Sequence, residues 1–167
     1  MAVLALRLST ALLAAALATA PAAAPTGSAP TWSWPVPRPH LVVRPYVAPP
    51  TPYGVGHRGI DLRAPVGTPV AAPDDGVVRF AGPVADRGVL AIDHGGVVSS
   101  LEPVRPVVLA GEHVVRGQVV GVVTAPGSTH PPGVLHLGAR IQAGYVSPLL
   151  LLGGLRRAVL LPLTLPP

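Results

Sequence analysis

Residues 57–70 read HRGIDLRAPVGTPV, and this stretch sets the first constraint on the fold. It contains two glycines and two prolines, which disfavour a helix and favour extended chain with turns. His57 and Asp61 are four residues apart within it. In a straight strand their side chains would share a face but lie about 13 Å apart, at about 3.3 Å per residue, which is too far for one metal ion. A bend at Gly59 is therefore required if both bind the same ion.

The surrounding chain repeats a pattern of short apolar segments separated by turn residues. No window shows a helical period with capping residues, so we predict an all-β fold. The domain is predicted to span residues 53–152, which is long enough for one modest core. The expected extended segments are residues 68–72, 77–80, 89–92, 97–101 and 134–139, with two further pieces joined by a glycine turn within 111–123.

A third candidate ligand lies in the segment 134–140. Period-2 alternation places Leu135 and Leu137 on one face of a strand and His136 on the other. Together with His57 and Asp61, His136 gives two histidines and one carboxylate with an open fourth position. This is the ligand count of a catalytic zinc site.

Three other histidines have less informative surroundings. His40 lies in a proline-rich segment, His94 in a glycine turn, and His113 at an expected surface position. We expect each of them to be solvated.

The composition excludes several classes of chemistry. The 167 residues include no cysteine and no lysine, and all 12 basic side chains are arginine. Disulfides, thiolate sites and Schiff-base lysines are therefore excluded, and so is a lysine-linked carrier domain, whose hairpin pattern residues 111–123 resemble. The arginines are scattered, with no interleaved aromatic side chains, so we expect no nucleic-acid partner.

The ends of the chain have their own composition. Residues 1–24 combine an early arginine, a short apolar run and small residues, the pattern of a secretory signal peptide, so we expect a secreted or cell-wall-associated protein with no stable membrane span after cleavage. An uncleaved anchor is the alternative.

Residues 25–52 are expected to form a proline-rich linker or wrapping arm without ladder hydrogen bonds, with Trp32 and Trp34 packed on the domain. Residues 153–167 are expected to be a frayed tail after a packed, leucine-rich edge.

Beyond these local patterns, the order and spacing of several motifs resemble one known family. Residues 57–70, Asp75-Gly76-Val77-Val78, Ile92-Asp93-His94-Gly95, residues 114–121 and Leu135-His136 are similar to the lysostaphin-type (LytM-like) zinc endopeptidases, secreted cell-wall hydrolases. The resemblance covers nearly all of residues 53–152. It implies a duplicated hybrid motif fold, in which antiparallel sheets form an open groove. It also implies that His57, Asp61 and His136 bind Zn²⁺ and that the substrate is a peptide of peptidoglycan.

Two positions depart from the family pattern. The family usually has H-x-H at the last ligand, and Val134 stands in place of its first histidine. The family also usually has Tyr-x-His at the end of the central strand, where this chain has Ser100-Leu101-Glu102. One interpretation is an active endopeptidase in which Glu102 acts as the general base and His130, in the loop 127–133, replaces the other histidine. The alternative is a catalytically degenerate zinc-binding or wall-binding module that regulates a partner hydrolase.

Overall fold

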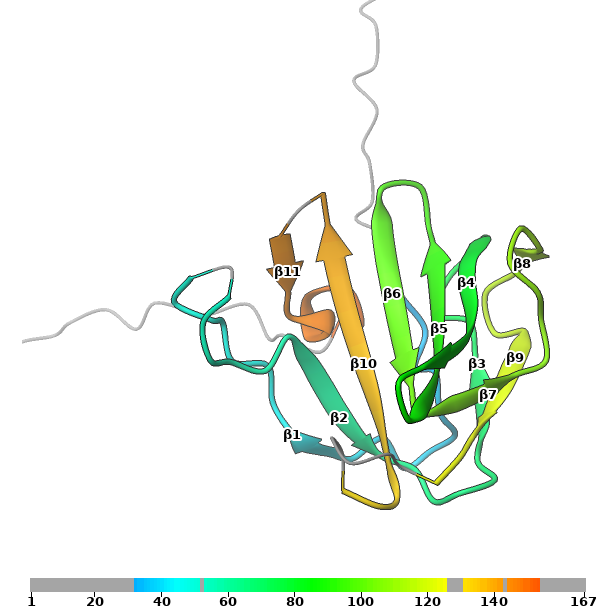
Figure 1. Ribbon diagram of the computed structural model, residues 1–167, viewed down its shortest axis with the longest axis horizontal. Helices are drawn as coiled ribbons and strands as arrows, with labels where there is room; N and C mark the ends of the chain where they lie inside the picture. Colours follow the sequence, from blue (N-terminus) through cyan, green and yellow to red (C-terminus); the bar gives the residue numbers. More distant parts are fainter. Residues whose placement is uncertain (1–31, 52, 126–130, 143, 154–167) are drawn as a thin grey trace, which may run out of the picture.

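The computed structural model describes residues 32–51, 53–125, 131–142 and 144–153. The predicted signal peptide, His130 and the tail beyond residue 153 lie outside these ranges. Nearly all of the regular structure is β-strand (Figure 1), as predicted. Among the described residues, no helix is long and apolar enough to cross a membrane.

Eight strands form the larger sheet, in the order β1-β2-β10-β6-β5-β4-β8. The eighth strand, β11, pairs with the last residues of β10, beyond the part of β10 that pairs with β2. Every pair in this sheet is antiparallel. The strands are β1 (Val42–Arg44), β2 (Gly59–Arg63), β4 (Gly76–Val84), β5 (Arg87–Asp93), β6 (Val97–Glu102), β8 (His113–Val114), β10 (Val134–Ile141) and β11 (Gly144–Val146).

Three strands form a smaller antiparallel sheet in the order β3-β9-β7. They are β3 (Pro69–Ala71), β9 (Val119–Val123) and β7 (Val104–Pro106). Both sheets contribute to one hydrophobic core, which includes Leu62, Leu101 and Leu137 from the larger sheet and Val70 and Val120 from the smaller one. Burying one such aliphatic side chain contributes about 1.5–3 kcal/mol.

The stretch 57–70 folds as an extended strand that ends in a tight turn. Arg58 forms a bend immediately before β2, one residue earlier than the bend predicted at Gly59. After β2, the hydroxyl of Thr68 donates a 2.6 Å hydrogen bond to the carbonyl of Pro65, and Gly67 takes a φ of +90°. Glycine suits that position because a side chain disfavours a left-handed backbone.

The proline-rich segment before residue 53 packs against both sheets. The backbone N–H of Trp32 donates to the carbonyl of Leu151, and the indole is 3% exposed. Trp34 packs against the core and stacks on His40, with ring centroids 4.6 Å apart. The packing of both tryptophans on the domain is thus confirmed.

The expectation that this segment makes no ladder hydrogen bonds is wrong for Val42–Arg44. These residues pair with β2 as the edge strand β1. Prolines flank the strand at Pro39 and Pro45 but leave its interior free to donate, which is the placement that an edge strand tolerates. The folded unit therefore includes residues from Trp32 onward.

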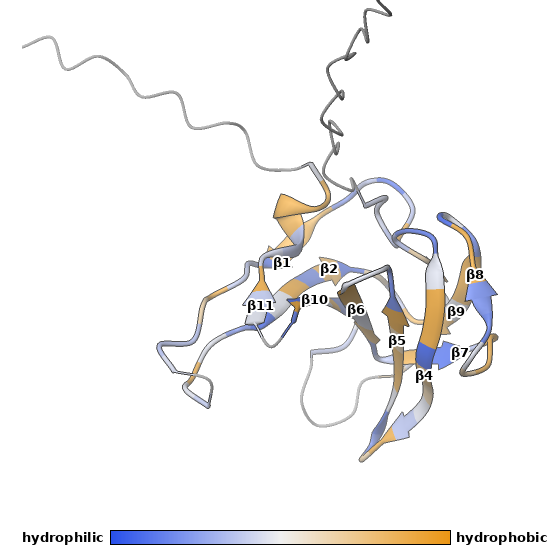
Figure 2. Ribbon diagram, turned by 90° about the horizontal axis from the view of Figure 1, so that it is seen from above, coloured by the Kyte–Doolittle hydropathy of each residue, from blue (hydrophilic) through white to orange (hydrophobic). Residues whose placement is uncertain are grey.

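Near the end of the described residues lies a short 3₁₀ helix, η1 (Pro148–Leu150), which is coloured hydrophobic in Figure 2. The next two residues, Leu151 and Leu152, are buried against the core. This is the packed edge predicted for the leucine-rich end of the domain.

Candidate metal centre

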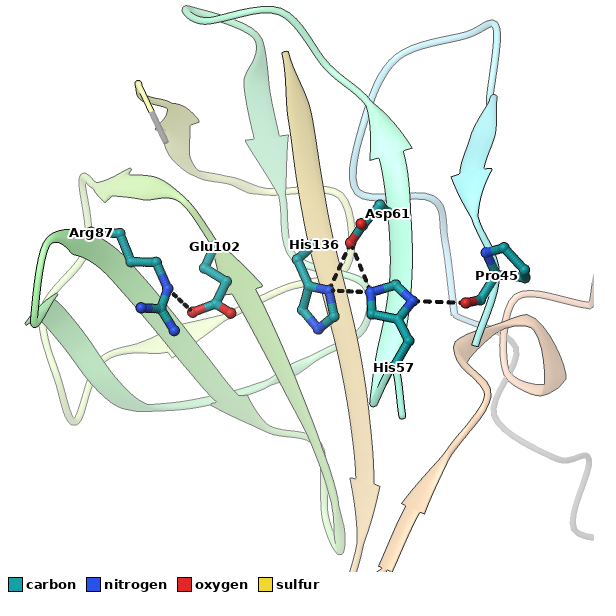
Figure 3. Close-up of polar contacts among 6 residues, drawn as sticks. All are labelled: Pro45, His57, Asp61, Arg87, Glu102 and His136. Carbon is teal, nitrogen blue, oxygen red and sulfur yellow. Dashed lines mark hydrogen bonds and ion pairs between the residues drawn. The ribbon is translucent and has the colours of Figure 1, made fainter. Parts of the chain in front are cut away.

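Three buried side chains from two distant parts of the chain meet at one point on the larger sheet (Figure 3). His57 precedes β2 and forms an isolated bridge with Val47, while Asp61 and His136 are direct partners across the β2–β10 ladder. The three residues are at most 9% exposed. The structure therefore brings together all three ligands suggested by the sequence.

The three donor atoms form a nearly equilateral triangle. His57 Nε2 lies 3.0 Å from Asp61 Oδ1 and 3.1 Å from His136 Nδ1, and His136 Nδ1 lies 2.8 Å from Asp61 Oδ1. Ligands about 2.0–2.1 Å from a tetrahedral zinc ion are separated by roughly 3.3 Å, which is close to the sides of this triangle. Two imidazoles and one carboxylate are also donors that zinc accepts. Both geometry and chemistry thus fit a zinc ion with one coordination position left open.

The tautomer of His57 is fixed from the side opposite Asp61. Its Nδ1 lies 2.7 Å from the backbone carbonyl oxygen of Pro45. A carbonyl can only accept, so Nδ1 must carry the proton and donate it. Neutral His57 therefore presents the lone pair of Nε2 to the centre of the cluster, which is the form that a metal requires.

Glycine makes room for the second imidazole. A Cβ at Gly59 would lie 2.6 Å from Nε2 of His136 and would overlap the carbonyl oxygen of Leu137. Gly138, the direct partner of Gly59 across the β2–β10 ladder, faces Ser100, whose hydroxyl a Cβ would likewise overlap. The position of the His136 ring therefore depends on the missing side chain of Gly59.

Glu102 lies one strand away from the cluster. It is the direct partner of His136 across the β6–β10 ladder, so both side chains project from the same face of the sheet. Its Oε2 accepts a 2.8 Å hydrogen bond from Nε of Arg87 (Figure 3). This interaction raises the pKa of Arg87 above its usual value. Glu102 is thus a cross-strand neighbour of His136, and it is part of an ion pair that the sequence pattern did not predict.

The position that usually carries a histidine in the lysostaphin-type enzymes holds a buried aliphatic side chain. Val134 is 7% exposed and is the direct partner of Arg63 across the β2–β10 ladder. It lies two residues before His136 and therefore on the same face of β10. His130, the predicted replacement for the missing imidazole, lies outside the described residues, so its role stays a prediction.

The prediction that the remaining histidines are solvated is wrong for His94. Its Nδ1 donates to the carbonyl of Asp75 at 2.8 Å, and its Nε2 accepts from the hydroxyl of Ser99 at 2.8 Å. Trp32 packs edge-on against the ring at 5.2 Å. Burial lowers the pKa of His94. The turn sequence gave no sign of this packing because Trp32 is 62 residues away in the chain. His113 is exposed, as predicted.

The carbonyl of Pro45 is the contribution to the site that sequence reasoning missed. A backbone oxygen has no residue-type signature, and Pro45 belongs to a segment that was expected to lack strand pairing. Its position follows from the pairing of β1 with β2, which brings the chain past His57.

A mainly antiparallel β fold with a buried His-Asp-His cluster defines a class of metallopeptidase-like domains. Residues 55–148 match the model of peptidase family M23, and the chain belongs to this family. The resemblance to the lysostaphin-type peptidases is thereby confirmed.

Comparison with curated proteins gives relatives that are longer than this chain. An uncharacterized protein of Mycobacterium tuberculosis is 40% identical over 126 residues, which cover 71% of this chain and 50% of the relative. The DD-carboxypeptidase/endopeptidase Mpg of Neisseria meningitidis serogroup B is 39% identical over 94 residues, covering 55% of this chain and 22% of that protein. The chain thus spans about half or less of the length of these relatives.

Solved structures agree on the fold. The catalytic domain of a mutant of the prophage-encoded M23 protein EnpA from Enterococcus faecalis matches with a TM-score of 0.58 and 25% identity, covering 70% of this chain and 95% of that one. A zinc-containing peptidase from Vibrio cholerae matches with a TM-score of 0.60 and 23% identity, covering 70% and 38%. The second match, at lower identity, supports the fold alone.

Proposed function

We propose that this chain is a secreted zinc-dependent endopeptidase that hydrolyses peptide cross-links of bacterial peptidoglycan. The observation that carries the proposal is the triangle formed by His57 Nε2, Asp61 Oδ1 and His136 Nδ1 in a member of peptidase family M23. The endopeptidase named in the Neisseria relative supports the reaction class. Secretion rests on the sequence pattern of residues 1–24.

Zinc, when bound, supplies Lewis acidity that polarises a peptide carbonyl and lowers the pKa of water. The residues of this chain hold and orient the ligands. His57 keeps its proton on Nδ1 through the carbonyl of Pro45, and the burial of Asp61 and His136 limits the contact of their donor atoms with bulk water. The low local dielectric strengthens every charge interaction there.

We assign the transfer of the proton from the attacking water to Glu102, with His130 as the second group that takes part in proton transfer. The support for Glu102 is its position directly across the ladder from His136. Arg87 would hold the Glu102 carboxylate in place through its ion pair. Loss of a general base reduces the rate by about 10²- to 10⁴-fold, so Glu102→Gln is expected to fall in this range while Arg87→Gln falls less.

The test is digestion of cross-linked peptidoglycan by the purified protein. New free amino groups and uncross-linked fragments are expected from the wild type and not from His57→Ala or His136→Ala. His113→Ala, which changes an exposed histidine outside the cluster, is the matched control and should remain active.

A wild type that releases no new termini, while containing zinc, would refute the endopeptidase and favour the degenerate module. The observation that favours the degenerate module is the buried Val134, which stands where the family usually has a histidine. Equal activity of the wild type and Glu102→Gln would refute the assignment of Glu102. N-terminal sequencing of exported protein tests secretion, because cleavage near residue 24 is expected.

A further inference from the structure

A pocket of about 390 Å³ lies beside the metal cluster, between β1, β2 and the start of β10. Asp61 forms part of its wall, so the pocket opens directly onto a ligand of the candidate centre. Its volume falls within the range of small-molecule sites, about 300–1,000 Å³. The remaining lining consists of Val43, Arg44, Arg63, Val134 and the loop residues 131–133.

Strand register places two arginines on either side of Asp61. Arg63 follows Asp61 by two residues in β2, so the two side chains share a face of the sheet. Arg44 is the partner of Asp61 across the β1–β2 ladder, where the register shifts between Val42 and Arg44, and it lines the same pocket as Asp61. Both arginine residues line the pocket.

The positive charge of these arginines is not neutralised within the described part of the chain. No acidic side chain there forms an ion pair with Arg44 or Arg63, whereas Arg87 pairs with Glu102 and Arg116 pairs with Asp74. Asp61, the acidic residue in the pocket wall, directs its Oδ1 at His57 and His136. The pocket therefore has uncompensated positive charge next to the candidate reaction centre.

The chemistry of the lining selects a carboxylate. A guanidinium group donates two parallel N–H bonds that match the two oxygens of a carboxylate. Valine and proline side chains complete the wall, and they suit the apolar part of a peptide residue. A free carboxylate group on a peptide satisfies both features.

We infer that Arg44 and Arg63 form a subsite for a free carboxylate of the substrate peptide, in the pocket beside the candidate metal centre. The inference rests on the proposed function for its choice of a peptide as the ligand. It assigns a binding role to β1, which lies in the proline-rich segment rather than in the motifs shared with the family. It also predicts that the protein prefers acidic peptides over neutral ones of the same length.

The test is a binding measurement that does not depend on cleavage. N-acetyl-tetraalanine with a free terminal carboxylate and the same peptide with a terminal amide are titrated into the purified full chain by calorimetry. We expect the acid to bind the wild type about tenfold more tightly than the amide, because two charge-assisted hydrogen bonds distinguish the ligands.

Arg44→Gln and Arg63→Gln should each lose most of this preference, and Arg105→Gln should keep it. Arg105 is an exposed arginine on β7 of the smaller sheet, so this control removes the same charge elsewhere. The zinc content of the four proteins is measured alongside, so that a difference in peptide binding at equal zinc content reports on the arginines. A thermal midpoint matching that of the wild type confirms that each variant is folded.

Equal binding of acid and amide by the wild type would overturn the subsite, as would a preference that survives in both arginine variants. The outcome is separable from that of the proposed function. An inactive protein with the acid preference would retain the subsite and lose the endopeptidase. A protein that cuts peptidoglycan but binds both peptides equally would do the reverse.

Discussion

Replacing Gly59 by alanine should damage both the fold and the metal centre, because the added methyl group has no space. Its Cβ would lie 2.6 Å from Nε2 and 2.7 Å from Cε1 of His136, and it would overlap the carbonyl oxygen of Leu137. Real Cβ contacts are essentially never shorter than 3.0 Å. Either β10 moves away from β2 or the His136 ring rotates out of the cluster.

The size of the effect follows from overpacking, which costs about 1–3 kcal/mol in a tightly packed interior. For a domain of this size, that corresponds to a fall in Tm of about 4–12 °C. Displacement of the His136 ring should also weaken zinc binding by about tenfold or more, which is typical when the groups that orient a metal ligand are disturbed.

Gly82→Ala is the matched control. A Cβ at Gly82 meets only the Phe80 ring, at 3.6 Å, which is an ordinary contact. Alanine in a strand is favoured over glycine by about 0.5–1 kcal/mol, so the Tm of this variant should stay level or rise slightly.

Thermal unfolding followed by circular dichroism and zinc competition with a chelating dye measure the two effects separately. A Gly59→Ala protein with the wild-type Tm would refute the packing argument. A protein with a lower Tm and unchanged zinc affinity would show that β10 moves without turning His136, contrary to the role given to Gly59 in the site.

Three further changes test other parts of the structure. Burial lowers the pKa of His94 below 6.5, so the unfolded chain takes up the proton first as the pH falls. The contribution of His94 to the free energy of unfolding should be complete above pH 6.5 and decline below it. Urea titrations should show a smaller decline in His94→Gln and the wild-type decline in His113→Gln. Glu102→Gln and Arg87→Gln each break the partly buried ion pair and should each lower the free energy of unfolding by about 1–2 kcal/mol. A double-mutant cycle in which the two losses simply add would contradict the ion pair. Trp32→Ala should cost about 3–5 kcal/mol in urea unfolding, and a cost below 1 kcal/mol would show that the segment before β1 does not belong to the core.

The sequence pattern predicted β3, β4, β5, β6, β8, β9 and β10, because local alternation and turn residues determine them, and it did not predict β1, β7 or β11. Alternation around His136 correctly separated Leu135 and Leu137, which are buried in the core, from the face that carries the imidazole. The distance along an extended chain also showed that His57 and Asp61 can meet only if the chain bends between them. The structure has that bend at Arg58.

Long-range contacts explain what the sequence pattern did not predict. Pro45 contributes a backbone oxygen, which no side-chain motif records. Arg87 and Glu102 are 15 residues apart and meet only because β5 and β6 pair. The burial of His94 depends on Trp32, which lies in a segment that composition alone marks as a linker.

The zinc content of the purified full chain tests the central claim most directly. Elemental analysis should find about one zinc ion per wild-type molecule and per His113→Ala molecule, and a sharp loss in His57→Ala and His136→Ala. A wild type without zinc at neutral pH, or one whose zinc survives both of those substitutions, would contradict the metal centre and the function built on it.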